Sequence, residues 1–332
     1  MLPRHVVVVG ASAGGIEALR ELVAGLPADF PAAIAIVLHT SPQSPGVLPE
    51  ILSRSGPLKA VSPTGSARLR AGVIYVAPPD FHLLIEPGHV RVAKGPRENR
   101  FRPAIDPLFR SAAQVCGPNA IGVVLTGNLD DGAAGLWAIK QLGGAAVVQD
   151  PNDALFPAMP QSALEHVNAD HVVPLEGIAP VLVRLTAVPA RNEAFQVPAL
   201  MEVEVKIARQ EDPLKAGVGK LGEPSAFACP ECHGVLLAVK EGGHIRFRCH
   251  TGHAYSAESL LAEIRDQIEV QLWNAIRAMQ EGNVLMRTMA THVELHSTTD
   301  SETLRERADE LQRQADTLRQ MVTSSPEPVN AE

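Results

Sequence analysis

Short apolar runs alternate with amphipathic stretches over residues 1–188, which we take as the first domain. The runs are four to six residues long and rich in Val, Ile and Ala, as buried strands are, and helical periodicity separates them. The predicted strands are Val6–Val9, Ala33–Leu38, Val73–Ala77, His82–Glu86, Ile121–Thr126, Ala145–Gln149 and His171–Pro174. The predicted helices are Gly14–Leu26, Pro45–Ser55, Asp106–Cys116, Gly132–Leu142, Pro160–Val167 and Gly177–Leu185. This alternation favours a Rossmann-like α/β fold with a doubly wound, mostly parallel sheet. The pair Val73–Ala77 and His82–Glu86, with the segment after Gly88, is expected to form a small antiparallel excursion.

The pattern changes after the first domain. Residues 189–226 carry four prolines, several glycines and mixed charges, which indicates a linker with a short helix near Leu200–Gln210. Residues 227–256 form a compact segment rich in Cys and His. From 257 to 323, apolar residues recur at steps of three and four with one polar break, which predicts a helical hairpin or a coiled-coil dimerisation arm. The polar end, 324–332, is predicted to be disordered.

The composition favours a globular protein and argues against a nucleic-acid partner. Hydrophobic residues make up 45% of the 332 positions and charged residues 20%, so a sizeable core can form. The formal net charge of −8 opposes nucleic-acid binding, which needs a basic surface to neutralise phosphates. No apolar run approaches the ~20 residues that span a bilayer, and the N-terminus lacks a secretory-signal pattern. We therefore expect no membrane insertion and a cytoplasmic location.

A predicted strand, a tight turn and a predicted helix meet at Ser12. The apolar run Val6–Val9 ends in the sequence Gly10–Gly15, which contains three glycines, and a helical pattern follows. In an α/β fold this arrangement places one hydroxyl beyond the carboxyl end of a strand, where reactive groups are exposed. Ser12 is therefore a candidate nucleophile.

A serine nucleophile needs a base and a group that orients the base. His39 directly follows the strand Ala33–Leu38, and Asp131 lies a few residues after the strand Ile121–Thr126. These residues and Ser12 fall at carboxyl ends of predicted strands, and therefore at one edge of one sheet. We expect His39 to take the Ser12 proton and return it to the leaving group, while Asp131 holds the His39 tautomer.

Attack by Ser12 would create a negatively charged oxygen, the oxyanion, which needs hydrogen-bond donors. The backbone N–H groups of Ala13 and Asn128 are the candidate oxyanion donors. Alternatively, the glycine turn could bind a phosphate in a doubly wound fold. It departs from the dinucleotide pattern, because Ser12 occupies the second Gly of G-x-G-x-x-G and His39, not an acidic residue, closes the second strand. Spacing alone leaves both interpretations open.

Three of the four cysteines lie within 21 residues, in a C-x₂-C-x₁₆-C-x₃-H pattern. The pattern contains two ligand pairs, Cys229 with Cys232 and Cys249 with His253, which together can close a tetrahedron around Zn²⁺. Two predicted strands between the pairs, Val235–Val239 and His244–Arg248, give a zinc-ribbon-like pattern. A site with four protein ligands is closed and therefore structural, so we expect no cofactor for catalysis. The alternative is reduced cysteines without metal in a disordered linker. The candidate ligands are Cys229, Cys232, Cys249 and His253, with His250 and His233 as rivals for the fourth position.

Six segments of the first domain stand in an order similar to that of a known family. They are Gly10–Gly15, Val37–Pro42, Tyr75–His82, Arg102–Asp106, Leu125–Ala133 and Gln149–Pro160. Together they resemble the catalytic domain of the chemotaxis protein-glutamate methylesterases (CheB), over about residues 5–187. The resemblance implies that Ser12 is the nucleophile, with His39 and Asp131 as its partners. Ala13 stands where the family usually has Thr, and Asn128 where it often has Met, and we expect the backbone donors to survive both changes.

The resemblance implies hydrolysis of glutamyl γ-methyl esters on the cytoplasmic helices of chemoreceptors, with deamidation of receptor glutamines as a second reaction. A chemotaxis methyltransferase, other signalling proteins and a second copy bound through the C-terminal helices are further candidate partners. The alternative to an enzyme is a non-catalytic signalling adaptor that binds partners through the same fold and its zinc and helical tail. The family's usual receiver domain is not found before His5, so the chain resembles stand-alone members that carry a Cys/His segment. We expect constitutive activity, or control by the C-terminal region or a partner.

Overall fold

The structure, a computed structural model, describes residues 5–191, 193–241, 244–293 and 298–324. It divides into two compact units, Met1–Leu260 and Leu261–Glu332. The first unit contains the predicted α/β domain, the predicted linker and the Cys/His segment, and the second contains most of the C-terminal helices.

The first unit is built on a seven-stranded sheet of order β10-β9-β8-β1-β2-β5-β3. All of its described pairings are parallel, which confirms the predicted fold class. β1 lies in the middle, with β2 on one side and β8 on the other. Their carboxyl ends therefore adjoin where the strand order reverses, which is the usual ligand position in such folds. The strands are β1 (Val6–Ala11), β2 (Ala33–Leu38), β3 (Lys59–Val61), β5 (Val73–Val76), β8 (Ala120–Val124), β9 (Ala145–Gln149) and β10 (His171–Val173).

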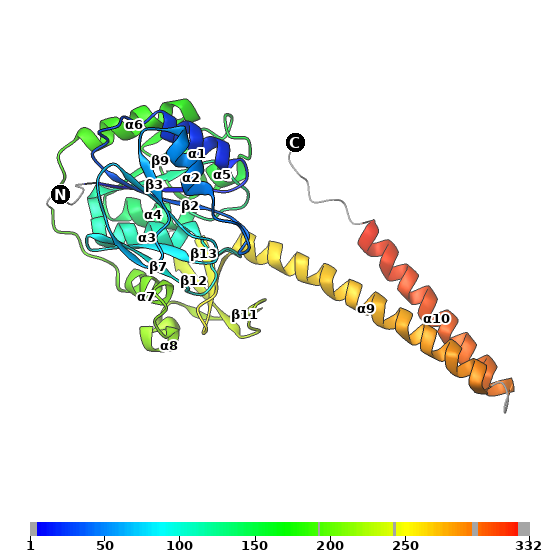
Figure 1. Cartoon of the computed structure of the whole chain (residues 1–332). Helices are drawn as coiled ribbons and strands as arrows, with labels where there is room; N and C mark the ends of the chain where they lie inside the picture. The colour runs from blue at the N-terminus through cyan, green and yellow to red at the C-terminus, as the bar shows by residue number, and fades with distance from the viewer. Residues whose placement is uncertain (1–4, 192, 242–243, 294–297, 325–332) are drawn as a thin grey trace. The chain divides into compact units, whose positions relative to one another are not determined.

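Helices cover both faces of this sheet (Figure 1). Alternate residues of β1 serve opposite faces: Val7 and Val9 pack with α1, α2 and α6, whereas Val6 and Val8 belong to the core under α3, α4 and α5. Full burial of a side chain of this size contributes about 1.5–3 kcal/mol, so both apolar layers stabilise the sheet. The helices are α1 (Gly15–Ala24), α2 (Leu48–Ser55), α3 (Ile105–Cys116), α4 (Ala133–Gln141), α5 (Ala158–His166) and α6 (Leu175–Ala187).

A second sheet of three antiparallel strands differs in part from the prediction. It consists of β4 (Ser66–Arg68), β7 (His89–Ala93) and β6 (His82–Glu86). The expected antiparallel pairing of Val73–Ala77 with His82–Glu86 is wrong, because β5 lies in the parallel sheet between β2 and β3. Most of β5 is buried, as a strand with neighbours on both sides should be, and the two prolines after it supply no N–H for a hairpin ladder.

The predicted linker is largely part of the folded unit. The expected short helix is α7 (Ala199–Ala208), and it packs against α3 with Met201, Val205 and Ile207 buried. A short helix α8 (Pro213–Ala216) follows. The prolines of this segment therefore lie near the ends of helices and strands, and much of the segment is packed and not a flexible linker.

The Cys/His module, defined here as residues 223–256, is a four-stranded antiparallel sheet. The predicted strands Val235–Val239 and His244–Arg248 lie within β12 and β13. The two glycines between these strands, 242–243, where the sequence favours a turn, lie outside the described residues. The strands, in order across the sheet, are β11 (Glu223–Ala228), β12 (Val235–Glu241), β13 (His244–Cys249) and β14 (Ala254–Ser256).

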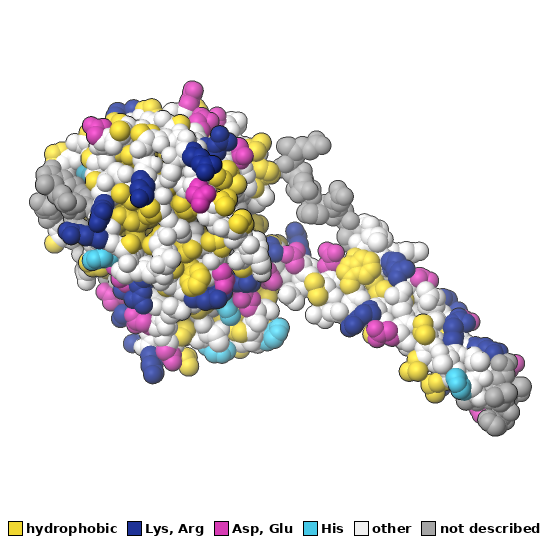
Figure 2. Space-filling model, in the orientation of Figure 1, with side chains coloured by type: hydrophobic (Ala, Val, Ile, Leu, Met, Phe, Trp, Pro, Cys, Tyr) yellow, Lys and Arg dark blue, Asp and Glu magenta, His cyan; other side chains and the backbone are white. Residues whose placement is uncertain are grey.

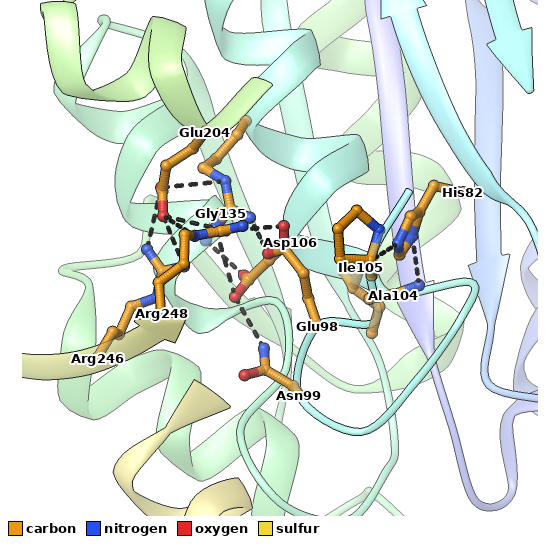
Figure 3. Close-up of polar contacts among 12 residues, drawn as sticks. His82, Glu98, Asn99, Ala104, Ile105, Asp106, Gly135, Glu204, Arg246 and Arg248 are labelled. Atoms are coloured by element: carbon orange, nitrogen blue, oxygen red, sulfur yellow. Dashed lines mark hydrogen bonds and ion pairs between the residues drawn. The ribbon is translucent and has the colours of Figure 1, made fainter. Parts of the chain in front are cut away.

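Buried charges join this module to the α/β domain (Figure 3). Glu204 of α7 pairs with Arg246 of β13 at 3.1 Å, and Arg248 of β13 pairs with Glu98 at 2.8 Å. Arg110 of α3 contacts both carboxylates, and none of the five side chains is more than 6% exposed. Burial alone would raise the pKa of Glu204, but the three surrounding arginines lower it well below its usual value. The network is therefore ionised and depends on all its members.

We expect Glu204→Ala to lower the free energy of unfolding by about 3–5 kcal/mol, because it leaves buried guanidinium groups short of a partner. Denaturant titration followed by circular dichroism measures this loss. Glu202→Ala, at an exposed position of the same helix, is the matched control and should be near neutral. The stabilisation by Glu204 is lost as pH falls through its lowered pKa, so the difference from wild type should shrink in acid. Equal stability of the two variants at neutral pH would contradict this account.

The C-terminal unit begins at Leu261 and contains most of α9 (Ala257–Val293) and all of α10 (Thr298–Thr323). The two helices are antiparallel: Asn283 Nδ2 donates to Ala308 O, and Ser301 Oγ donates to Ala290 O at 3.0 Å. This arrangement matches the predicted hairpin, whereas the dimerisation arm stays a prediction. The predicted disordered tail, 324–332, lies outside the described residues except for Ser324. None of the described helices combines the length and the hydrophobicity that a membrane span requires.

Candidate active site

Ser12 lies immediately after β1, in a turn fixed by backbone hydrogen bonds. Its N–H donates to Thr126 O at 3.0 Å, and Gly15 N–H donates to Ser12 O at 2.9 Å. Gly14 has a φ of 72°, a conformation that costs glycine little. The sequence therefore folds here as expected, with the serine between the end of a strand and the start of α1.

His39 and Asp131 meet Ser12 at this edge of the sheet. His39 follows β2 directly, and its Nδ1 lies 3.1 Å from Ser12 Oγ. On the other side of the ring, Nε2 lies 2.7 Å from Asp131 Oδ2. Because an ionised carboxylate only accepts, we assign the proton to Nε2, which leaves the Nδ1 lone pair facing the serine. The structure thus brings the three sequence-predicted residues into one hydrogen-bonded chain.

Asp131 is surrounded by donors. Its side chain is 1% exposed and accepts from the N–H of Ile105 at 2.7 Å, from Asn99 Nδ2 at 2.8 Å and from His39. Burial alone would raise the pKa of Asp131, but these hydrogen bonds and the charge of a protonated His39 lower it below its usual value. Asp131 is therefore an anion that can stabilise an imidazolium.

Two nearby carboxyl groups behave differently. Burial, reinforced by the charge of Asp131, raises the pKa of Asp106 to about 6. Burial also raises the pKa of Asp130 to about 7, although a hydrogen bond from Ser256 opposes the shift. Asp130 and Asp131 are adjacent in the sequence, but of the two only Asp131 contacts His39 and is held ionised. Asp131 is therefore the carboxylate that can orient His39.

Three contributors to this geometry were not predicted. The ring of Phe101 stacks on His39, with centroids 3.7 Å apart and planes within 6°. Asn99 donates to Asp131, as described above. Thr126 Oγ1 donates to Ala13 O at 3.1 Å and accepts from Phe156 N–H at 2.8 Å, which ties the serine turn to the loop after β9. Their signal in the sequence is weak, because Asn99 and Phe101 lie in an irregular loop just before the Arg102–Asp106 segment.

One candidate oxyanion donor, Ala13, follows Ser12 in the chain, and the other, Asn128, lies in the loop after β8. In the described residues, neither Ala13 N–H nor Asn128 N–H has a protein acceptor, and Asn128 is exposed. A Cβ on Gly127 would come within 2.8 Å of Ser12 Cβ and 2.4 Å of Met159 Sδ, so only glycine allows this loop to approach the serine. This close approach places the backbone of Gly127 beside Ser12.

The Cys/His module brings together the four predicted metal ligands. Ligand atoms of Cys229, Cys232, Cys249 and His253 all lie within 4.8 Å of one another. His253 Nδ1 lies 3.7 Å from Cys229 Sγ and 3.6 Å from Cys249 Sγ. Its other nitrogen lies 3.3 Å from Glu231 Oε2, as expected of a histidine ligand oriented by a carboxylate. The rivals His250 and His233 are not part of this group.

Known proteins of one family are similar to this chain over the α/β domain. The CheB methylesterase family model matches residues 7–182, more than half of the chain. A Leptospira interrogans protein, provisionally named protein-glutamate methylesterase/protein-glutamine glutaminase, is 43% identical over 180 residues, 54% of this chain and 93% of its own length. An Anaeromyxobacter dehalogenans protein of the same two named activities is 42% identical over 193 residues, 54% of this chain and 51% of its own length.

A solved structure supports the same assignment. The crystal structure of the Thermotoga maritima CheB methylesterase catalytic domain is 32% identical and superposes with a TM-score of 0.52. The match covers 55% of this chain and 98% of that domain. With the strand order, the placement of Ser12, and a family match over residues 7–182, the chain belongs to the CheB methylesterase family.

Proposed function

We propose that this chain hydrolyses glutamyl γ-methyl esters of chemoreceptors, with Ser12 as the nucleophile. The observation that carries the proposal is the hydrogen-bonded chain from Ser12 through His39 to the ionised Asp131. An adaptor has no use for a serine aligned with a base and an oriented carboxylate. The names of the relatives, which state methylesterase activity, support the same choice.

The geometry suggests a two-step acyl transfer. Ser12 Oγ attacks the ester carbonyl carbon as its proton passes to His39 Nδ1, and the N–H groups of Ala13 and Asn128 stabilise the oxyanion. The tetrahedral intermediate then expels the methoxy group, which takes the His39 proton and leaves as methanol. Water attacks the acyl-enzyme with the same nitrogen as base, which releases the glutamyl carboxylate and restores Ser12. A glutamine side chain would follow the same path and release ammonia.

The partners follow from this substrate. We place the chain in the cytoplasm, acting on the cytoplasmic helices of chemoreceptors. Lys and Arg side chains are mixed with Asp and Glu over the face drawn in Figure 2, which supports the expectation of no nucleic-acid partner. The α9–α10 hairpin exposes apolar side chains, Val284, Leu285 and Met289 among them, which could bind a second copy, a methyltransferase or another signalling protein.

The decisive experiment measures methanol released by the full chain from a chemoreceptor fragment that carries glutamyl methyl esters. Release at a rate proportional to enzyme concentration is expected. Binding of the fragment without any release would favour the adaptor.

We also propose that the four-residue cluster binds Zn²⁺ structurally. Tetrahedral Zn–S bonds of about 2.3 Å place ligand atoms about 3.7 Å apart, close to the distances found here. Three thiolates and one imidazole form a closed set, so zinc would hold the module together and supply no chemistry to Ser12.

We expect about one equivalent of zinc in the purified full chain, measured by elemental analysis. Cys232→Ser removes a ligand and should lower the zinc content or the concentration of chelator needed to extract it. Cys116→Ala, a cysteine outside the cluster, is the control and should keep the metal. Less than half an equivalent in the wild type would count against the zinc site.

A further inference from the structure

One strand of the Cys/His module pairs with the loop that supports the triad. Asn99 N–H donates to Ala254 O of β14 at 2.8 Å, and Ala254 N–H donates to Arg97 O at 3.2 Å. Ser256 N–H, also in β14, donates to Asn99 Oδ1 at 2.9 Å. A residue more than 150 positions away in the sequence therefore fixes the Asn99 side chain.

Asn99 carries this contact to Asp131. Its side-chain nitrogen donates to Asp131 Oδ1 at 2.8 Å and to Asp106 Oδ2 at 3.0 Å (Figure 3 shows the contact with Asp106). Asn99 is 3% exposed, and its φ of 49° is one that asparagine adopts more readily than most residues. The position needs a side chain that accepts on one side and donates to two carboxyl groups on the other. An amide does both, whereas a carboxylate of the same shape would not donate.

The same loop also reaches His39. Phe101, which stacks on the His39 ring, exchanges backbone hydrogen bonds with Glu98 at 2.9 and 3.2 Å. Glu98 in turn pairs with Arg248 of the module. One short loop, 98–101, thus presents Phe101 to the base and Asn99 to its orienting carboxylate, and the module contacts this loop at Glu98 and Asn99.

The proposed zinc ligands lie next to β14. His253 directly precedes Ala254, and its carbonyl accepts from Cys249 N–H at 2.9 Å. A metal bound to Cys249 and His253 closes this turn and fixes the point where β14 begins. β14 has only three residues. Besides its pairing with β13 and the loop, it is held by Ser256 Oγ, which donates to Asp130 Oδ1 at 2.7 Å, and by the buried Tyr255, whose OH lies 3.9 Å from Sγ of the candidate ligand Cys229.

We propose that Asn99 is a positioning residue for Asp131, and that zinc in the Cys/His module supports the triad through β14 and Asn99. The inference rests on the proposed function for its kinetic readout alone. When the metal or the Asn99 amide is lost, Asp131 loses a fixed donor and its carboxylate can turn away from His39. The enzyme then binds substrate as before but activates Ser12 poorly.

Two substitutions separate positioning from filling of space. Asn99→Ala should lower kcat about 10–100-fold with little change in KM, while the protein keeps its zinc. Asn99→Asp keeps the size but cannot donate when ionised and adds charge beside Asp106 and Asp131, so it should be at least as impaired. Asn119→Ala is the matched control, because among the described residues the Asn119 amide bonds to the backbone of Arg191, away from the triad. Wild-type kcat in either Asn99 variant would overturn the positioning role.

The coupling to zinc is tested by a cycle of metal removal and substitution. Chelation should lower the kcat of the wild type about 10–100-fold, and added Zn²⁺ should restore it. In Asn99→Ala, whose kcat is already low, chelation should lower kcat by less than about a further threefold. By reciprocity, Asn99→Ala should also lose zinc at a lower chelator concentration. Equal losses in the two proteins would show that the metal acts by another path. If chelation unfolds the module, the zinc retention of the Asn99 variants still decides the coupling, and unchanged retention would refute it.

A substrate-free measurement keeps this inference distinct from the proposed function. The His39 Nε2 proton bonded to Asp131 should give a low-field proton NMR signal that weakens in Asn99→Ala and on zinc removal. Failure of the wild type to release methanol, with that response intact, would reject the substrate but not the coupling. An NMR signal indifferent to both changes would reject the coupling itself.

Discussion

Ser12→Ala should reduce methanol release by at least about 10³-fold, because it removes the hydroxyl that is aligned with His39 to form the acyl-enzyme. The residual rate would come from water and the oxyanion donors alone. Ala fits the turn, since the backbone bonds of Ser12 to Thr126 and Gly15 do not use the hydroxyl. Release is measured with the esterified receptor fragment, and ammonia release from receptor glutamine should fall in parallel.

A matched control for this substitution is Ser41→Ala, at an exposed serine two residues past His39. It should keep near-wild-type activity, and both variants should unfold at the wild-type temperature. A Ser12→Ala protein that retains more than a tenth of the wild-type rate would remove Ser12 as nucleophile.

The triad could be predicted from sequence because each member is tied to a local signal. Ser12, His39 and Asp131 each follow an apolar run that reads as a buried strand, and parallel strands bring their carboxyl ends to one edge. Asn99 and Phe101 have no such signal. Their roles arise from contacts to residues 32 and 62 positions away, in a loop without periodicity.

The packing of the Cys/His module against the α/β domain could not be predicted either, because it also depends on contacts between residues far apart in the sequence. Glu204 lies in a helical pattern, where a charged residue indicates a solvent-exposed face. It is buried because arginines from α3 and β13 converge on it, and sequence patterns do not reveal such distant pairs. The prediction of a linker at 189–226 missed this for the same reason, since prolines mark breaks in elements but not where those elements pack.

Asp131→Asn should cost about 10⁴-fold in kcat/KM for methanol release, comparable to the loss of the orienting carboxylate in other serine triads. The wild-type side chain accepts from donors on both oxygens: His39 and Ile105 N–H on Oδ2, and Asn99 on Oδ1. An asparagine must turn its NH₂ group toward one of these sides, so at least one donor faces another donor. If the NH₂ group faces His39, it favours the tautomer with the proton on Nδ1, which cannot accept the Ser12 proton.

Asp130→Asn is the sharpest control for this prediction, because it makes the same chemical change one residue away. Burial raises the pKa of Asp130 to about 7, so near neutral pH the substitution replaces a carboxyl group that is already partly protonated. An asparagine there can still accept the hydrogen bond from Ser256, and we expect less than about a fivefold effect on rate. Similar losses in the two variants would mean that the shared acidic loop, and not the carboxylate on His39, carries the effect. A large loss confined to Asp131→Asn, with an unchanged unfolding temperature, would assign it to the tautomer of His39.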